Sequence, residues 1–145
     1  KFNHGLPANL SGATKDQAML NHGFKALQIA VSAWTAEALK NTMPASVFSR
    51  STECHNQDKV SMGTIAARDC IRVLELTEQV VSAMLIAVVQ GVELRGNHSQ
   101  QGIEIQTTIK QVREEIDFLE SDRALEQELR LCIQLIRDRH WNLYD

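Results

Sequence analysis

A polar run in the middle of the chain carries the side chains best suited to acid–base chemistry. Residues 51–58 read Ser-Thr-Glu-Cys-His-Asn-Gln-Asp, and a long apolar helical pattern follows directly. The entrance of a helix gathers unpaired N–H groups and the positive end of the helix dipole. We therefore expect this run to be sheltered rather than ordinary surface, and to form a site for an anionic or proton-transferring ligand.

Glu53 is the candidate acid or base of this run. Burial beside a thiol, an imidazole and two amides would raise its pKa toward a working value, although loop carboxylates are more often solvated. Asn56 and Gln57 can hold a carboxylate or a polarised carbonyl without adding charge, because an amide both donates and accepts. Loop capping is their plainer alternative.

The other reactive side chains favour structural interpretations. His55 has no second His or Cys at metal spacing, so a hydrogen-bonding histidine is expected and a metal site is not. Nothing marks Cys54 as an activated nucleophile, and a small buried filler is the better expectation. Upstream, Lys25 is expected to be solvated and Ile29 to belong to the core.

The hydropathy pattern predicts an all-α, long-helix bundle in a single domain over residues 1–145. The expected elements are a loop over 1–15, a helix over 16–43, the site loop over 44–58, a long core helix over 59–95, and carboxy-terminal helices over 99–120 and 122–140. The apolar stripes that predict them step by three and four residues: Phe24, Leu27, Val31, Trp34 and Ala38; Ile105, Ile109, Val112, Ile116 and Leu119; Leu125, Leu129, Cys132, Ile133 and Ile136.

Side chains at the expected helix ends predict how each helix begins. Asp58 or Ser61 is placed to cap the long helix, and Ser121-Asp122 gives a capping signal for the last one. Glu126 and Arg130 have the spacing of a favourable (i, i+4) ion pair.

The long helix is apolar on nearly every side between Val80 and Val89. At 1.5 Å per residue it would be about 50 Å long, too long for this chain to enclose. We expect helices from other segments or subunits to cover it. The apolar stretch is about half of the ~20 residues that a membrane span requires, so a core helix is predicted.

Composition excludes several classes of function. The net charge of −3 arises from 15 basic and 18 acidic residues spread along the chain, which argues against a nucleic-acid or acidic-membrane partner. Three cysteines without a CxxC pair fit the reducing cytoplasm. Phosphate-loop, nucleophile-elbow and dinucleotide motifs do not occur. The chain opens without methionine inside an expected loop, which suggests a piece of a longer protein.

Four blocks, in order and at matching separation, resemble the carboxy-terminal part of the aromatic amino acid ammonia-lyases. They are residues 2–10 (Phe-Asn-His-Gly-Leu-Pro-Ala-Asn-Leu), 23–25 (Gly-Phe-Lys), 53–58 (Glu-Cys-His-Asn-Gln-Asp) and 90–95 (Gln-Gly-Val-Glu-Leu-Arg). The resemblance covers about two thirds of the chain, and beyond Gly96 it is only general.

The resemblance implies a larger, mainly helical enzyme whose chemistry uses a methylidene-imidazolone electrophile made from an internal Ala-Ser-Gly. A tyrosine base removes a β-proton, and ammonia and an unsaturated acid result. It implies that Glu53 lies near the substrate amine and that Asn56 and Gln57 line the pocket around the electrophile. It further implies that Lys25 borders this pocket, that Ile29 contacts the substrate side chain, and that the enzyme is a homotetramer with active sites built from several subunits.

Two departures from the family pattern restrict what these residues can do alone. No Ala-Ser-Gly occurs, and the only tyrosine, Tyr144, is at the wrong end to be the base. Both groups are expected in an amino-terminal part outside this chain, so the 145 residues are predicted to be inactive by themselves.

The resemblance favours phenylalanine or tyrosine as substrate. The histidine-specific branch usually has Glu at the position of Gln57, whereas the phenylalanine and tyrosine branch has Gln, as here. A histidine ammonia-lyase and an aromatic aminomutase, which uses the same residues, remain as alternatives.

Two hypotheses outside this enzyme class are also compatible with parts of the sequence. A non-enzymatic helical oligomerisation module would be favoured if the upstream coding region lacked Ala-Ser-Gly. A small hydrolase using Cys54 and His55 is disfavoured, because adjacent loop residues seldom point at each other and no oxyanion hole is signalled.

Overall fold

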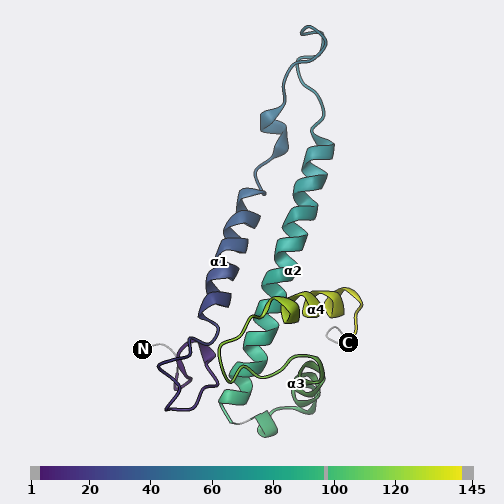
Figure 1. The fold of residues 1–145 in the computed structure, drawn as a ribbon. Helices are drawn as coiled ribbons and strands as arrows, with labels where there is room; N and C mark the ends of the chain where they lie inside the picture. The colour runs from purple at the N-terminus through teal and green to yellow at the C-terminus, as the bar shows by residue number, and fades with distance from the viewer. Residues whose placement is uncertain (1–3, 97, 142–145) are drawn as a thin grey trace.

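The computed structural model describes residues 4–96 and 98–141. It contains four α-helices, α1 (Lys25–Lys40), α2 (Gly63–Leu94), α3 (Ile103–Glu115) and α4 (Glu126–Arg137), with 3-10 turns at Ala8–Leu10, Ala45–Phe48 and His98–Gln100. Within the described ranges the only β-type pairing is an isolated bridge between Thr52 and Gln57. The all-α prediction is confirmed (Figure 1).

The first two helices form an extended antiparallel arm (Figure 1). Phe24, which precedes α1, and Leu27 of α1 are buried in one cluster with Ala83 and Ile86 of α2. Val31 and Trp34 continue the same stripe, partly buried. Further along the arm, Arg72 pairs with Glu37 at 2.8 Å. Exposed ion pairs contribute little, so the apolar stripe, as predicted from its spacing, is what joins the helices.

The second half of α2 packs on part of its surface against a compact lobe made of α3, α4 and the amino-terminal loop (Figure 1). Its buried side chains come from the predicted stripes and from the chain end: Ile109, Val112, Ile116, Leu119, Cys132 and Trp141. Trp141 is therefore an anchor. Three residues discussed above lie outside the described ranges: Phe2 and Asn3 of the first resemblance block, and the single tyrosine, Tyr144.

A fully buried glutamine, Gln90 of α2, ties three segments of this lobe together. Its Nε2 donates to the carbonyl oxygens of Leu10 (2.6 Å) and Leu119 (3.3 Å), and the Leu119 N–H donates to its Oε1 (2.8 Å). Because no water reaches these groups, the amide is the partner that their burial requires.

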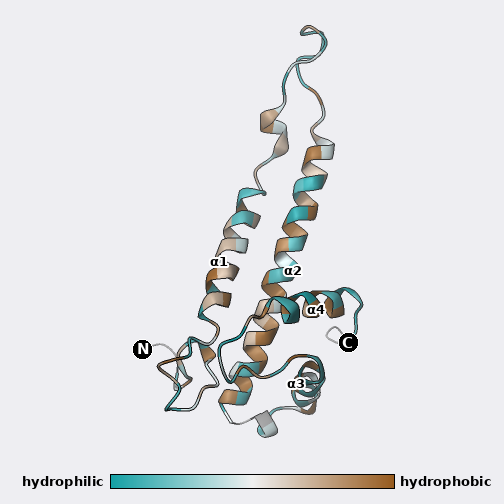
Figure 2. Cartoon of the chain, in the orientation of Figure 1, coloured by the Kyte–Doolittle hydropathy of each residue, from teal (hydrophilic) through white to brown (hydrophobic). Residues whose placement is uncertain are grey.

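A large apolar surface of α2 is left uncovered by its own chain. Ile65, Ile71, Leu74, Met84 and Val88 are all more than 45% exposed. Figure 2 shows how far hydrophobic residues extend along this helix. An 18-residue window has a mean hydropathy of 1.5 and is 33% buried, a length and composition that suit either a membrane span or the core helix of a larger assembly.

The predicted helix over 16–43 was too long at its start. It begins at Lys25 because Gly23 has a left-handed backbone (φ +56°), where a Cβ would lie 2.7 Å from the Asn9 carbonyl oxygen. In addition, the N–H groups of His22 and Gly23 donate to Asp122 instead of taking part in a helix. At the other end it stops at Lys40, three residues before the predicted end.

The long helix and α3 also differ from their predicted bounds. α2 begins at Gly63, and its cap position is occupied by Met62, which makes no side-chain cap bond, so neither Asp58 nor Ser61 is the cap; Ser61 Oγ, one residue earlier, accepts the Gly63 N–H at 3.3 Å. α3 stops at Glu115 rather than 120, because Ile116 is extended and the next residues carry Leu119 to its bonds with Gln90 and Gly12.

The predicted cap of the last helix was wrong. α4 begins at Glu126 rather than 122, and no side chain caps it. The Asp122 carboxylate instead binds the turn before α1, a partner about one hundred residues away. The Glu126–Arg130 ion pair is present at 2.8 Å, as predicted.

We expect Gln90→Leu to lower the free energy of unfolding by about 3 kcal/mol, since it leaves the N–H of Leu119 and the carbonyl of Leu10 without partners, while the Leu119 carbonyl keeps its bond from the Gly12 N–H. Gln134→Leu, at an exposed amide that bonds only Asp138, should change it by less than about 0.5 kcal/mol. If chemical denaturation gave the two variants equal free energies of unfolding, the proposed stabilising role of Gln90 would be contradicted.

Candidate active site

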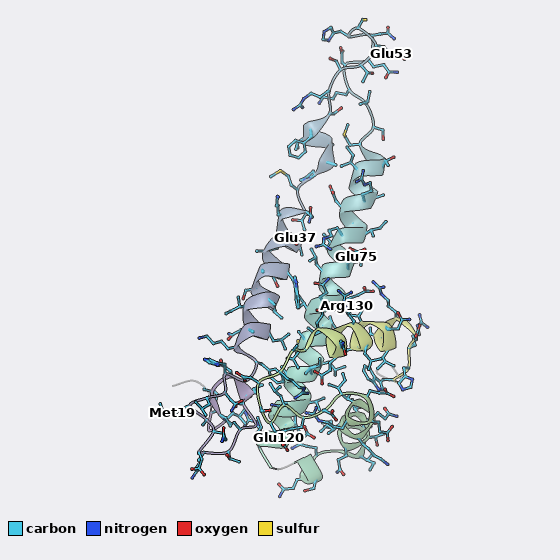
Figure 3. All side chains as sticks on the ribbon, viewed as in Figure 1. Met19, Glu37, Glu53, Glu75, Glu120 and Arg130 are labelled. Carbon is cyan, nitrogen blue, oxygen red and sulfur yellow. The ribbon has the colours of Figure 1, made fainter. Side chains whose placement is uncertain are left out.

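The site loop forms a hairpin tip beyond the ends of α1 and α2 (Figure 3, Glu53). At its base Ser49 Oγ bonds both the N–H and the carbonyl of Val60 at 2.9 Å. Nearer the tip Thr52 and Gln57 exchange backbone hydrogen bonds of 3.0 and 3.3 Å. Residues 53–56 are therefore the closed turn between two paired residues.

This turn has an unusual backbone. Glu53, Cys54 and His55 have φ values of 52°, 55° and 67°, so three successive residues other than glycine are left-handed. Each such residue costs roughly 1–2 kcal/mol. Left-handed backbone at non-glycine residues clusters at functional sites, where the surrounding structure enforces it.

Hydrogen bonds within the tip set the candidate side chains in fixed relations. Asn56 Nδ2 donates to Glu53 Oε2 (3.4 Å), which holds the acid beside the first amide. Thr52 Oγ1 donates to Gln57 Oε1 (2.9 Å), which orients the second amide and leaves its N–H donors for a ligand. Sequence reasoning missed Thr52, because only the folded pairing places it opposite Gln57.

The neighbours of Glu53 agree with the sequence only in part. His55 Nδ1 lies 2.8 Å from Ser51 Oγ, so it is the hydrogen-bonding histidine that was predicted. Cys54 is exposed rather than a buried filler, because the turn projects beyond the core. Glu53, Asn56 and Gln57 are exposed as well, so this chain alone does not provide the expected shelter.

Lys25 and Ile29 lie at the opposite end of the arm. They occupy the first turns of α1, while the site loop follows its last residue, and a helix of 16 residues is about 24 Å long. One chain therefore does not bring Lys25 and Glu53 into the same pocket. Ile29 is 62% exposed, so its default assignment to the core was wrong.

The start of α1 borders two hollows, and Lys25 and Ile29 line both of them. One of about 500 Å³ is also lined by the amino-terminal loop, and one of about 280 Å³ is also lined by Asp122 and Arg123. Lys25 is exposed there, as expected. The part of α1 that carries both predicted substrate contacts is thus an open surface of this chain.

Asp122 is a residue near these candidates that sequence reasoning assigned to the wrong helix. The His22 backbone N–H lowers the pKa of the Asp122 carboxyl most strongly, and the His22 ring and the Gly23 N–H lower it further. Elsewhere on the arm, the Arg72 hydrogen bond lowers the pKa of Glu37. Within residues 4–96 and 98–141, no cluster of His, Cys, Asp and Glu side chains could hold a metal ion.

Comparison with known proteins establishes the family of this chain. The model of a family described as aromatic amino acid lyase matches residues 1–114. The chain belongs to the aromatic amino acid lyase family. It is 36% identical over 131 residues to a tyrosine ammonia-lyase of Cereibacter sphaeroides (89% of this chain) and 30% identical over 127 residues to a histidine ammonia-lyase of Photobacterium profundum (88% of this chain).

Solved structures share the fold of this family member. Histidine ammonia-lyase from Trypanosoma cruzi superposes with a TM-score of 0.80 at 28% identity over 93% of the chain. Tyrosine aminomutase from Streptomyces globisporus superposes with a TM-score of 0.82 at 28% identity over 94%. The chain spans about a quarter of the length of these relatives: 24% and 25% of the two lyases and 26% and 25% of the two solved chains.

We expect thermal stability to fall in acid partly through Asp122. A pKa that is lower in the folded state contributes stability above the ordinary value, 3.8 for Asp122, and this stability is lost as the pH falls through and below that value. Asp122→Asn should therefore flatten the decline of the unfolding midpoint between about pH 5 and about pH 3. Glu126→Gln, which removes a carboxylate from the same segment, should keep the decline; equal slopes in all three proteins would contradict this origin.

Proposed function

We propose that this chain is the carboxy-terminal part of an ammonia-lyase that converts an aromatic L-amino acid, phenylalanine or tyrosine, to an arylacrylic acid and ammonia. The observation that carries the proposal is the preorganised tip, where the backbone and side chains hold one carboxylate and two neutral amides together. Family membership supplies the reaction class for such a set.

Each residue at the tip has a distinct task in this proposal. Glu53 binds the substrate amine: its Oε2 is engaged by Asn56, and Oε1 accepts an ammonium proton. This leaves a neutral amine whose lone pair is available to the electrophile, which would make that nitrogen a leaving group. When the β-proton is removed and the Cα–N bond breaks, the proton held by Glu53 returns to the nitrogen, and ammonia is released. Lys25 and Ile29, at the start of α1, contact the substrate carboxylate end and side chain.

The family's methylidene-imidazolone group fits the donor set of the tip. Amide N–H groups donate to a ring carbonyl without adding charge, and Thr52 leaves the N–H donors of Gln57 available for this purpose. Asn56 and Gln57 would therefore hold the group, which supplies an electrophile that makes the amine a better leaving group. It would be formed from an Ala-Ser-Gly elsewhere in the protein, as would the tyrosine base.

The geometry supports an active site assembled from several copies. The tip and the start of α1 lie at opposite ends of one arm, so a pocket that uses both needs a second chain or other segments. The uncovered apolar surface of α2 provides an interface for them. A cytoplasmic homotetramer, in which α2 is a core helix and neither membrane nor nucleic acid is bound, is the assembly we propose.

Gln57 favours a neutral aromatic ring over imidazole, because a carboxylate at this position would suit a basic ring and an amide does not. Tyrosine ammonia-lyases are 36% and 34% identical to the chain and histidine ammonia-lyases are 29% to 34% identical, so the identities overlap and the choice of ring rests on Gln57. Aminomutase activity is the second candidate, because solved tyrosine aminomutases share the fold with TM-scores of 0.81 and 0.82.

The protein that carries this chain together with its upstream region should release ammonia from phenylalanine or tyrosine and form a product with cinnamate-type ultraviolet absorbance. Residues 1–145 alone should show no turnover. A β-amino acid in place of the unsaturated acid, identified by mass spectrometry and chromatography, would indicate the mutase. An inactive longer protein with its electrophile formed would count against both.

Gln57→Glu should lower kcat/KM for phenylalanine and tyrosine by at least about tenfold, because a carboxylate replaces the neutral amide donors near the ring and the electrophile. The ratio of histidine to tyrosine turnover should rise. Thr52→Val, which removes the hydroxyl that orients Gln57 but adds no charge, should reduce tyrosine turnover without raising this ratio. Unchanged substrate preference in Gln57→Glu would exclude this role.

A further inference from the structure

The start of α1 is held by a residue from a distant segment that the family model does not cover. That model ends at residue 114, and the hold is supplied by Asp122. The Asp122 carboxylate accepts the backbone N–H groups of His22 (2.8 Å) and Gly23 (2.9 Å), and lies 3.2 Å from His22 Nδ1. In return the Asp122 N–H donates to Asn21 Oδ1 (2.7 Å).

These bonds between Asp122 and residues 21–23, which we call the clasp, take the place of the side-chain cap that α1 lacks. Phe24 occupies the cap position, and no side chain bonds the first turn from there. The Phe24 N–H donates instead to the Asn9 carbonyl (2.9 Å), and Gly23 fits only without a Cβ. Backbone position at residues 22–24 is thus determined by two other segments, with the carboxylate placed at the positive end of the helix dipole.

The residue next to Asp122 is itself fixed in place. Arg123 donates to the carbonyl oxygens of Phe118 (3.2 Å) and Asp117 (3.0 Å) and pairs with Glu128 (2.7 Å). Asp122 therefore lies in a loop that is itself held in place by hydrogen bonds and an ion pair. Asp122 and Arg123 form one wall of the 280 Å³ hollow whose other wall carries Lys25 and Ile29.

We propose that Asp122 is a positioning residue of the lyase reaction: its carboxylate holds the turn that leads into α1, so that Lys25 and Ile29 at the start of the helix meet the substrate. The inference deepens the proposed function and rests on it. Two adjacent backbone donors and a ring nitrogen need both carboxylate oxygens, which an asparagine at this position does not provide. Misplacement of the helix start affects substrate binding, since both residues are assigned to binding and not to proton transfer.

The test measures KM and kcat of the full-length protein and of its Asp122→Asn and Asp122→Ala variants. Each should raise KM for the aromatic substrate about tenfold or more while changing kcat less than about threefold. In a Lys25→Ala background, Asp122→Asn should raise KM by less than it does alone, because one of the two contacts that it positions is already gone. Glu126→Gln, which removes the same charge and an exposed ion pair four residues away, should leave KM unchanged.

A second readout does not depend on activity. Hydrogen exchange at the amides of His22 and Gly23, which donate to Asp122, should quicken about tenfold or more in Asp122→Asn and not in Glu126→Gln. Unchanged KM in Asp122→Asn, or additive effects of the Asp122 and Lys25 substitutions, would overturn the proposal whatever happens to thermal stability. If the unsubstituted protein eliminates no ammonia, the proposed function fails instead, and the exchange result alone then describes a structural clasp.

Discussion

The apolar stripe between α1 and α2 is the interaction on which the arrangement of this chain depends. The stripe consists of Phe24, Leu27, Val31 and Trp34. It packs along α2 and keeps the two antiparallel helices side by side. A two-helix arm joined in this way is long and narrow, so its two ends cannot approach each other. The stripe therefore separates the hairpin tip from the start of α1, and with it the two groups of candidate substrate contacts.

Each end of the arm is organised by a different means. At the tip, strained backbone is enforced by the pairing of Thr52 with Gln57 and by short side-chain bonds within the loop. At the other end, Gln90 and Asp122 bring together segments that are 80 to 100 residues apart in sequence. Local bonds at the tip and long-range bonds at the lobe therefore hold the candidate substrate contacts in place while these contacts stay exposed in this chain.

Exposure is the feature that joins these observations to the proposed chemistry. A carboxylate and two amides in open water would neither shift a proton equilibrium nor exclude solvent, whereas the same set covered by neighbouring helices would do both. The uncovered apolar surface of α2 also favours an assembly, since contact with water is unfavourable for it and burial against another helix would lower the free energy. One assembly would satisfy both requirements, which is why the proposed active site and the proposed oligomer are a single hypothesis.

The sequence by itself determined the helical class, the faces that pack, the Glu126–Arg130 pair and the identity of the candidate tip, because these follow from local spacing and from residue type. The left-handed turn at Glu53, the exposure of Ile29 and Cys54, the early end of α3 and the true partner of Asp122 were decided by tertiary structure. The early end of α3 depends on the Gln90 amide at Leu119, and the partner of Asp122 on N–H groups in the turn before α1, both distant in sequence. The left-handed turn at Glu53 depends on the backbone pairing of Thr52 with Gln57, and the exposure of Ile29 and Cys54 depends on where the rest of the chain packs. Periodicity cannot register such partners, since it measures only what lies within a few turns of the same helix.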